Sequence, residues 1–302
     1  MKIAVVGAGG VGGYVGGCLA RAGHEVAMLA RGEHLSAIRA KGLEVREPEG
    51  SARVQVRASD AVADLAGADI ALVAVKSYSL PEAAPAVRTL TESGAVALPL
   101  LNGVEAVDSL IDQGVPRDRI LAGLIMISAA RVAPGVVERK STFRSAVVGE
   151  PGGGASPRAE AVAAALREAS VETRVSGEVA VDLWRKFLFI ATVSAGCGLA
   201  RAAVGAVREA PYGRLLFERA AAEVGAVGRA RGVALPQAEE NNVLKTIDGM
   251  APALKPSFLL DVERGGPNEL DILSGAVARY GRAVSVATPI HDAVVAALTA
   301  GR

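Results

Sequence analysis

The chain has 302 residues, of which 33 are Lys or Arg and 32 are Asp or Glu, so its formal net charge is +1. Basic and acidic residues are interleaved, which argues against the clustered basic excess of a nucleic-acid-binding domain, and 51% hydrophobic residues argue against disorder. The two cysteines, Cys18 and Cys197, make neither a disulfide framework nor a metal cluster. We therefore expect a soluble, cytoplasmic protein of about two domains that binds no metal, nucleic acid or membrane.

The N-terminal segment has the pattern of a nucleotide-binding unit. Residues 2–6 are apolar and β-branched without alternation, which predicts a short buried strand. A G-x-G-x-x-G sequence follows, then a helix ending near Arg21 and a second strand at residues 24–29. This order of elements predicts dinucleotide binding, the alternative being a glycine-rich turn without a ligand. The predicted diphosphate ligands are Gly7, Gly9, Gly10, Val11 and Gly12.

The same segment has a second interpretation by hydropathy alone. Residues 3–20 carry no charge, so the run also resembles a signal peptide or a short membrane span. Seven of these 18 residues are glycine, a poor residue for an apolar helix. Glycine suits a tight turn and the close approach of a diphosphate. We therefore assign the glycine-rich segment to the nucleotide site.

The end of the second strand indicates which dinucleotide is bound. NAD enzymes usually have Asp or Glu about 20 residues after the glycine motif, where it binds the ribose 2′-hydroxyl. Here Arg31 stands 19 residues after Gly12. A guanidinium can bind a 2′-phosphate through two hydrogen bonds, which favours NADP. The alternative is a solvated Arg31, with Glu33 accepting the ribose hydroxyl.

Strand and helix patterns alternate as far as residue 176. Strands are expected at 69–75, 95–100, 145–148 and 171–175, and a helix at 157–169. The fold class is therefore α/β, with a Rossmann-type doubly wound parallel sheet over residues 1–176. From 177 to 302, Ala-rich patterns interrupted by Pro and Gly predict an all-helical domain. Its longest apolar run, 187–200, has 14 residues, too few to span a bilayer, and predicts a core helix.

Several polar residues are candidates for the chemistry. Lys76 and Asn102 directly follow apolar runs, and ligands of open α/β sheets collect at the carboxyl ends of strands. Each has an ordinary alternative, because Lys76 can simply reach solvent and Asn102, followed by glycine, can form a turn. In the helical part, Lys186 can instead extend to water, Ser257 can cap a helix, and Glu269 can be a first-turn acid.

The histidines are not promising candidates for catalysis or metal binding. His24, His34 and His291 form no triad and no metal-ligand spacing with the cysteines. We expect all three to be structural.

Taken together, these motifs resemble the ketopantoate reductase (2-dehydropantoate 2-reductase) family over nearly the whole chain. The resemblance rests on GAGGVGG, LARGEHL at 29–35, AVK at 74–76, LNG at 101–103, LWRK at 183–186, and S-x-x-x-D with NELD at 257–271. It implies a Rossmann domain followed by a helical domain. It also implies NADPH-dependent reduction of a 2-oxo acid to a 2-hydroxy acid, with 2-dehydropantoate, a precursor in pantothenate biosynthesis, as the expected substrate.

The resemblance also implies roles for individual residues. Lys186 corresponds to the general acid that protonates the carbonyl oxygen, and an ammonium also stabilises the developing alkoxide. Glu269 corresponds to the carboxylate that holds the distal hydroxyl of the substrate, beside the cofactor. The remaining correspondences are Ser257 with a hydroxyl that contacts the substrate carboxylate, Asn102 and Lys76 with residues at the mouth of the nicotinamide and substrate site, and Arg31 with the 2′-phosphate ligand.

The chain departs from the family pattern on the helix face of Lys186. The family typically carries Asn four and eight residues after the lysine, on one face of the helix, whereas this chain has Ile190 and Ser194. A buried polar partner left unpaired costs roughly 1–3 kcal/mol. We include Ser194 among the substrate-binding residues, and Ile190 leaves three alternatives: ketopantoate, a related branched or aromatic 2-oxo acid, or a non-catalytic NADP-binding sensor. The high apolar content permits a homodimer without requiring one.

Overall fold

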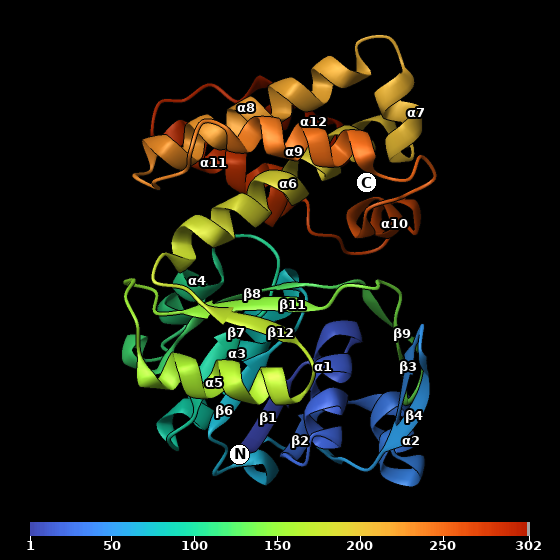
Figure 1. Cartoon of the computed structure of the whole chain (residues 1–302), viewed down its shortest axis with the longest axis vertical. Coiled ribbons are helices and arrows are strands. Elements are labelled where there is room, and N and C mark those ends of the chain that lie inside the picture. Colours follow the sequence, from blue (N-terminus) through green and yellow to red (C-terminus); the bar gives the residue numbers. More distant parts are fainter. Residues whose placement is uncertain (301–302) are drawn as a thin grey trace. The chain divides into compact units, whose positions relative to one another are not determined.

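The computed structural model describes residues 1–300, which form two compact units (Figure 1). The first unit contains Met1–Leu101 and Glu105–Val179. The second contains Asn102–Val104 and the chain from Ala180 onward. The division thus falls in the first turn of a helix rather than after residue 176, and a three-residue segment from the N-terminal half groups with the C-terminal unit.

A five-stranded parallel sheet, sheet A, lies at the centre of the first unit, in the order β5-β2-β1-β6-β7. Its strands are β1 (Lys2–Val6), β2 (Glu25–Leu29), β5 (Arg57–Ser59), β6 (Ile70–Val73) and β7 (Val96–Pro99). The chain moves outward from β1 in both directions, which creates the strand-order reversal where α/β sheets bind ligands. The strands predicted at 2–6, 24–29, 69–75 and 95–100 are confirmed, with small differences at their ends.

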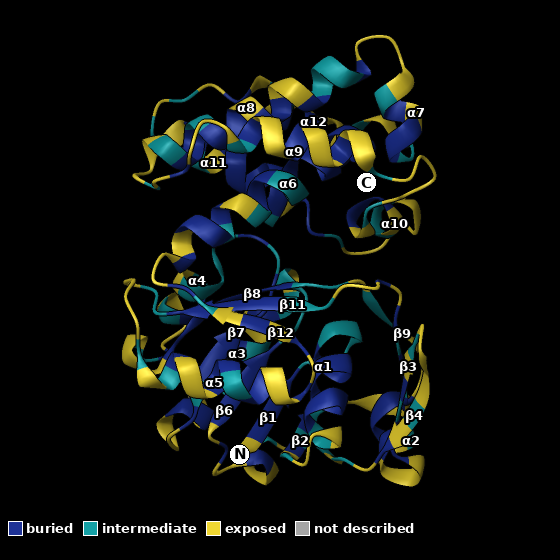
Figure 2. Ribbon diagram, viewed as in Figure 1, coloured by how far each residue is buried: buried dark blue, intermediate teal, exposed yellow. Residues whose placement is uncertain are grey.

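Helices cover both faces of sheet A. Ile3 and Val5 of β1 belong to one hydrophobic core and Ala4 and Val6 to another, as expected when successive strand residues point to opposite faces. The first core includes α1 (Gly10–Arg21) and α5 (Pro157–Glu168), and the second includes α3 (Leu80–Glu92) and α4 (Ala106–Asp112). Figure 2 shows the strands buried between helices whose outer surfaces are exposed. The predicted doubly wound architecture is confirmed.

A second, mixed sheet continues the first. β8 (Ala122–Met126), β11 (Ser145–Gly149) and β12 (Glu172–Val175) form a three-stranded sheet in which β11 is antiparallel to β8 and parallel to β12. A bridge between Ala97 and Ile120 joins it to sheet A. The strands predicted at 145–148 and 171–175 therefore exist, but they do not extend an all-parallel sheet.

A four-stranded sheet that the sequence pattern did not predict, sheet B, packs against α1. Its strands are β3 (Leu43–Glu47), β4 (Gly50–Val54), β9 (Ala129–Ala133) and β10 (Val136–Arg139), in the order β4-β3-β10-β9. These strands are short, and several carry charged residues on an exposed face. They therefore lack the continuous apolar pattern that marks the buried strands of sheet A.

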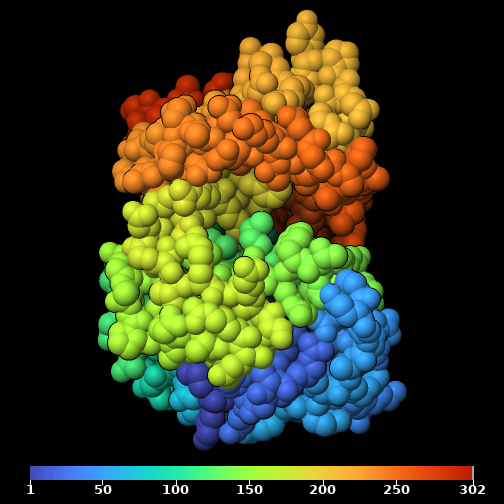
Figure 3. Space-filling model, in the orientation of Figure 1, coloured from blue at the N-terminus to red at the C-terminus, as the bar shows by residue number. Residues whose placement is uncertain are grey.

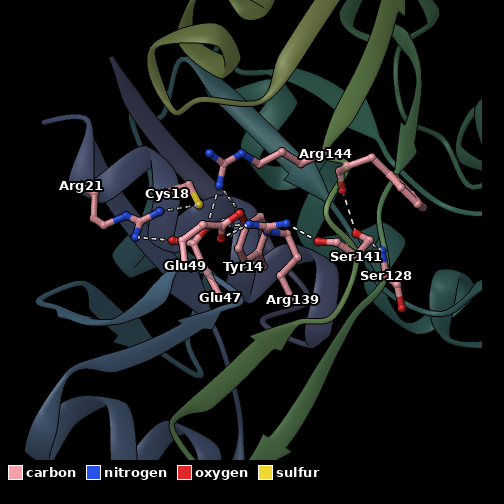
Figure 4. Close-up of polar contacts among 10 residues, drawn as sticks. Tyr14, Cys18, Arg21, Glu47, Glu49, Ser128, Arg139, Ser141 and Arg144 are labelled. Atoms are coloured by element: carbon pink, nitrogen blue, oxygen red, sulfur yellow. Dashed lines mark hydrogen bonds and ion pairs between the residues drawn. The ribbon is translucent and has the colours of Figure 1, made fainter.

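A polar cluster connects α1 to sheet B (Figure 4). Glu47 of β3 accepts hydrogen bonds from the Tyr14 hydroxyl (2.6 Å) and the Arg21 guanidinium (2.6 Å), both on α1. Arg144 donates to the same carboxylate at 2.7 Å, and Cζ of the buried Arg139 lies 5.7 Å from the centre of the Tyr14 ring. Burial and the neighbouring Glu47 raise the pKa of Tyr14, so its hydroxyl stays a hydrogen-bond donor. Charge-assisted bonds thus hold the glycine-rich helix on the sheet.

In the second unit, all regular elements from residue 180 to residue 300 are helical. They are α6 (Val179–Ala200), α7 (Val204–Glu209), α8 (Gly213–Ala230), α9 (Glu239–Gly249), α10 (Ser257–Glu263), α11 (Ala276–Ala283) and α12 (Pro289–Ala300). Figure 3 shows the orange segment that contains α9 at the surface of this unit. The predicted helical C-terminal part is confirmed.

Helix α6 is the core helix of the second unit. Its residues 191–198 are all buried, and glycines at 196 and 198 leave room for the rings of Phe217 and Phe258. Among residues 1–300 it is the one helix long and apolar enough to cross a membrane, by length and composition alone. In the structure, 61% of its most apolar window is buried, as in the core helix of a globular unit.

Candidate active site

The glycine loop after β1 has the backbone that a dinucleotide requires. Gly7 has a φ of +102°, and a Cβ at Gly12 would lie 2.1 Å from the Gly7 carbonyl oxygen, so neither position accepts another residue. A Cβ at Gly9, the N-cap of α1, would meet nothing within 4 Å. Open space therefore lies in front of the helix, where first-turn N–H groups such as that of Val11 are exposed to a ligand. These residues fit a diphosphate.

Packing accounts for the remaining glycines of α1. A Cβ at Gly10, Gly13 or Gly17 would lie 2.4, 2.7 and 2.6 Å from the nearest atom of sheet B, and one at Gly16 would lie 2.7 Å from Met28 of β2. Four of the seven glycines that we assigned to the nucleotide site therefore let α1 lie directly on two sheets. This corrects the sequence interpretation, which attributed the whole run to the approach of a diphosphate.

Three predicted nucleotide ligands lie at one edge of sheet A. Gly7, Arg31 and Lys76 follow the carboxyl ends of β1, β2 and β6, which are adjacent strands. Lys76 is half-buried at the start of a short 3-10 turn. Because the carboxyl ends of parallel strands meet at the same edge, all three lie where ligands of this fold bind.

The Arg31 side chain has an acidic partner that the sequence analysis did not identify. Arg31 is the N-cap of α2 (Gly32–Lys41), and its guanidinium forms an ion pair with Glu82 of α3. Both side chains are about two-thirds exposed (68% and 66%), so the pair is open to solvent and to a ligand. Glu33, the alternative acceptor for the ribose hydroxyl, is exposed in the first turn of α2. No local pattern marks Glu82, because it is 51 residues from Arg31 in the chain.

In the second unit, Lys186 lies near the N-terminal end of α6, between anchored neighbours. The Trp184 ring contacts Phe187 edge-to-face at 5.4 Å, and Arg185 donates to Glu239 at 2.8 Å. Lys186 is half-buried and interacts electrostatically with Glu269. Burial lowers the pKa of Lys186 to about 8, against the opposing effect of the Glu269 carboxylate. The ammonium is thus poised to exchange a proton near neutral pH.

Asn102 and Glu269 are hydrogen-bonded to each other. Asn102 donates from Nδ2 to Oε2 of Glu269 at 3.1 Å, and Glu269 is 3% exposed. Gly103 has a φ of +87°, and a Cβ there would lie 3.2 Å from Cδ1 of Ile272. Asn102 and Gly103 lie in a bend of the chain that packs on the residues after Glu269. These contacts explain why residues 102–104 group with the second unit.

Glu269 precedes a π-helical turn rather than beginning a regular α-helix. The turn, Asp271–Gly275, runs directly into α11, and Gly275 N–H donates to the Leu270 carbonyl at 2.9 Å. Within the turn, Ser274 Oγ lies 3.1 Å from Nδ1 of the buried His291. Burial lowers the pKa of His291 to about 4, so this ring is neutral near pH 7. Isolated π turns occur frequently at functional sites.

The remaining predicted substrate residues differ in exposure. Ser194 is buried on α6, eight residues and about 12 Å along the helix from Lys186. Ile190 lies between them on the same face and is half-buried. Ser257 is exposed and is the first residue of α10, whose N-cap is Pro256 without a side-chain cap bond, so the capping alternative is wrong. The structure brings Lys186, Asn102 and Glu269 together, and roles for both serines stay predictions.

Within residues 1–300, no group of three or more His, Cys, Asp or Glu side chains could hold a metal ion. Both cysteines are buried, and they form no disulfide bond.

Comparison with protein families assigns both units. The family described as "Ketopantoate reductase PanE/ApbA" matches residues 3–153, and "Ketopantoate reductase PanE/ApbA C terminal" matches residues 178–302. The chain belongs to the ketopantoate reductase family. As a member of that family it is an oxidoreductase, and the resemblance inferred from its motifs is confirmed.

Full-length relatives agree with the membership of the chain in the ketopantoate reductase family. A 2-dehydropantoate 2-reductase of Halobacterium salinarum is 33% identical over 293 residues, which cover 96% of this chain and 95% of that protein. "Uncharacterized oxidoreductase YkpB" of Bacillus subtilis is 30% identical over 298 residues, covering 99% and 98%. The crystal structure of a PanE/ApbA family ketopantoate reductase from Ralstonia eutropha JMP134 has a TM-score of 0.90 at 30% identity, covering 99% and 97%.

Proposed function

We propose that this oxidoreductase uses NADPH to reduce a 2-oxo acid to a 2-hydroxy acid, and that its substrate is 2-dehydropantoate, the product being pantoate for pantothenate biosynthesis. The observation that supports the proposal is the arrangement around Lys186. A half-buried ammonium with its pKa lowered to about 8 lies beside a buried carboxylate, Glu269, which is itself held by Asn102. This arrangement combines a proton donor with a group that can bind a hydroxyl.

In this proposal Lys186 is the general acid. The reduced nicotinamide, when bound, supplies a hydride to the carbonyl carbon of the substrate. The Lys186 ammonium donates a proton to the carbonyl oxygen and stabilises the negative charge that develops there. Because its pKa of about 8 is above neutral pH but close to it, the group is mostly protonated and still gives up its proton readily.

Glu269 and the serines select the substrate. The Glu269 carboxylate accepts a hydrogen bond from the distal hydroxyl of the substrate, and Asn102 orients it by donating to Oε2. A hydroxyl bound by a buried carboxylate gives strong discrimination, because an analogue without it leaves the carboxylate unpaired. Ser257 is proposed to contact the substrate carboxylate, and Ser194 to line the deeper part of the site.

The cofactor is proposed to bind along the edge of sheet A. First-turn N–H groups of α1 hold the diphosphate, Arg31 binds the 2′-phosphate, and Lys76 lies toward the nicotinamide and substrate. Asn102 and Glu269 contact the nicotinamide end in the same proposal. A cytoplasmic location and a homodimer remain predictions from composition.

Ile190 supports a second candidate substrate. A half-buried hydrocarbon side chain one turn from Lys186 stands where the family typically has an amide, and it favours a branched or aromatic 2-oxo acid without a distal hydroxyl. The alternative of a silent NADP-binding sensor is disfavoured, because the contacts that join Lys186, Glu269 and Asn102 are intact.

A steady-state survey of 2-oxo acids, with NADPH and with NADH, tests the proposal. We expect the highest kcat/KM for 2-dehydropantoate with NADPH. If kcat/KM is higher for an apolar branched or aromatic 2-oxo acid, that acid is the substrate, and the proposed reaction, reduction of a 2-oxo acid, still holds. Tight NADPH binding without turnover of any 2-oxo acid would contradict the proposal and support the sensor.

A further inference from the structure

His34 connects the glycine loop to two other elements of the first unit. It lies in the first turn of α2, is 4% exposed, and its Nε2 is 2.7 Å from the carbonyl oxygen of Ala8, between Gly7 and Gly9. On the other side of the ring, the backbone N–H of Gly135 donates to Nδ1 at 2.9 Å. The imidazole therefore spans the space between the glycine loop and the turn that joins β9 to β10.

These two contacts determine the protonation state of the ring. A backbone N–H can only donate, so Nδ1 must be unprotonated to accept the bond from Gly135. A carbonyl oxygen can only accept, so Nε2 must carry the hydrogen that binds Ala8. His34 is therefore held as the neutral Nε2–H tautomer. A proton added to Nδ1 would face the Gly135 N–H and break that bond.

The groups around the ring favour its neutral form. The glycine loop and the β9–β10 turn contribute only backbone groups, and the charge that acts on the ring is the guanidinium of Arg131 on β9. Burial lowers the pKa of His34 below its ordinary value of 6.5, and Arg131 lowers it further, while the bond to Ala8 opposes both. Protonation of the ring therefore requires a more acidic solution than an ordinary histidine needs.

The Gly135 turn is built to hold the ring in place. Gly135 has a φ of +71°, and a Cβ there would lie 2.9 Å from Cβ of Ala37 on α2, so the turn can approach the helix only as glycine. The same α2 turn begins with Arg31, the proposed 2′-phosphate ligand. One helical turn thus carries a proposed ligand of the nucleotide and the side chain that holds the glycine loop.

We infer that His34 is a positioning residue for the nucleotide: its neutral ring, clamped between Gly135 and the Ala8 carbonyl, holds the glycine loop in the conformation that binds the diphosphate. This inference rests on the proposed function. Nucleotide affinity then depends on the protonation of His34, although the ring does not touch the ligand. Acidification releases Gly135 from the ring and loosens the loop.

The test compares NADP⁺ binding by wild type, H34Q, H34N and a control, S36A, by isothermal titration calorimetry. A glutamine amide can place a donor near the Ala8 carbonyl and does not titrate, whereas an asparagine amide can accept from Gly135 but leaves Ala8 without its donor. Ser36 is exposed on the same helix, outside the binding machinery. Titrations run from about pH 7.5 down to the lowest pH at which wild type and H34Q both stay folded, because the pKa of His34 lies below that of an ordinary histidine.

At the higher pH we expect S36A to match wild type within about twofold, and H34Q and H34N, which each keep only one of the two contacts, to bind roughly three- to tenfold more weakly, as for one lost hydrogen bond. On acidification, wild type should lose more affinity than H34Q by a similar factor. The 2′-phosphate of the ligand titrates equally in both proteins, so it does not affect this difference.

If wild type binds nucleotide, either of two results would overturn the inference. One is unchanged affinity of H34N alongside a lowered melting temperature, which would make His34 merely structural. The other is a parallel loss of affinity by wild type and H34Q on acidification, a comparison that holds even if H34N fails to fold. Wild type that binds neither NADP⁺ nor NAD⁺ would instead overturn the proposed function, and the inference with it.

Discussion

Nδ2 of Asn102 donates a hydrogen bond to Oε2 of Glu269 at 3.1 Å, although 167 residues separate the two along the chain. The bond joins the bend after β7 to the residue that precedes the π turn, and Gly103 packs on Ile272 beside it. Glu269 in turn acts electrostatically on Lys186. The three polar side chains are therefore expected to respond to substitution as one unit.

Glu269→Gln should move the pH dependence of Lys186. The Glu269 carboxylate raises the pKa of Lys186 against the lowering effect of burial, so removing its charge should shift the pKa below about 8. The alkaline limb of the pH–rate profile for reduction should move to lower pH, and KM for the 2-oxo acid should rise. Asn102→Asp, which adds a negative charge, should move the same limb to higher pH. If the alkaline limb is unchanged in both variants, Glu269 does not influence the pKa of the proton donor.

Lys186→Ala should lower kcat for reduction by roughly 10²–10⁴-fold, as expected for loss of a general acid. In wild type, kcat should be nearly constant below pH about 8 and fall as pH rises through that value, because reduction needs the ammonium form. Oxidation of the 2-hydroxy acid should show the opposite dependence. Lys245→Ala, at an exposed position of α9, is the matched control. A loss of less than threefold, with nucleotide affinity intact, would exclude Lys186 as the acid.

Lys186→Met should stabilise the protein at pH 7. Folding lowers the pKa of Lys186 from 10.5 to about 8, so the ammonium carries a penalty of up to about 3 kcal/mol. The penalty is fully present below pH about 8 and disappears as pH rises toward 10.5, because the unfolded chain binds the extra proton in that window. Guanidinium denaturation should show a gain for the variant at pH 7 that shrinks at high pH. A less stable variant at pH 7 would contradict a net penalty for burying the Lys186 ammonium beside Glu269.

Glu82 should limit the affinity for NADP(H). Its ion pair with Arg31 is exposed and contributes about 0–1 kcal/mol, and its negative charge lies beside the proposed 2′-phosphate site. Glu82→Gln should therefore tighten NADPH binding by up to about fivefold and leave NADH binding unchanged or weaker. Arg31→Ala should weaken NADPH far more than NADH. Equal losses for both nucleotides in Arg31→Ala would indicate that the enzyme uses NAD.

Ile190→Asn should improve the use of 2-dehydropantoate. The substitution returns an amide to the face of α6 that carries Lys186, where a buried polar group without a partner costs roughly 1–3 kcal/mol. We expect kcat/KM for 2-dehydropantoate to rise and that for apolar 2-oxo acids to fall. Ile190→Leu keeps the hydrocarbon and is the control. A loss of activity toward every 2-oxo acid in Ile190→Asn, with the fold intact, would show that another group already serves this position.

Local sequence pattern was sufficient for the buried strands of sheet A and for the glycine loop that follows β1. The buried strands of sheet A are continuous apolar runs, and the turn after β1 needs glycine at Gly7 for its backbone angle, so both leave a direct mark on the sequence. The order of strand, loop, helix and strand depends on neighbours within about thirty residues. The same holds for α6, whose apolar length predicts a core helix.

Long-range contacts account for what the pattern did not show. Sheet B has no continuous apolar signal, and its position explains Gly10, Gly13 and Gly17, which the sequence suggested were for the ligand. The acid beside Arg31 is Glu82 and not the nearby Glu33. His34, for which the sequence offered only a structural role, lies between the carbonyl of Ala8 in the glycine loop and the N–H of Gly135, which is 101 residues away in the chain.

The residue types of the site, a lysine, a carboxylate and a glycine loop, can be read from the chain, since each is required by its own chemistry or backbone. Their protonation states and partners cannot. The lowered pKa of Lys186 comes from burial on α6, which outweighs the opposing effect of Glu269, and the neutral tautomer of His34 comes from two backbone groups. Both depend on groups that are far apart in the sequence and become neighbours only in the folded chain.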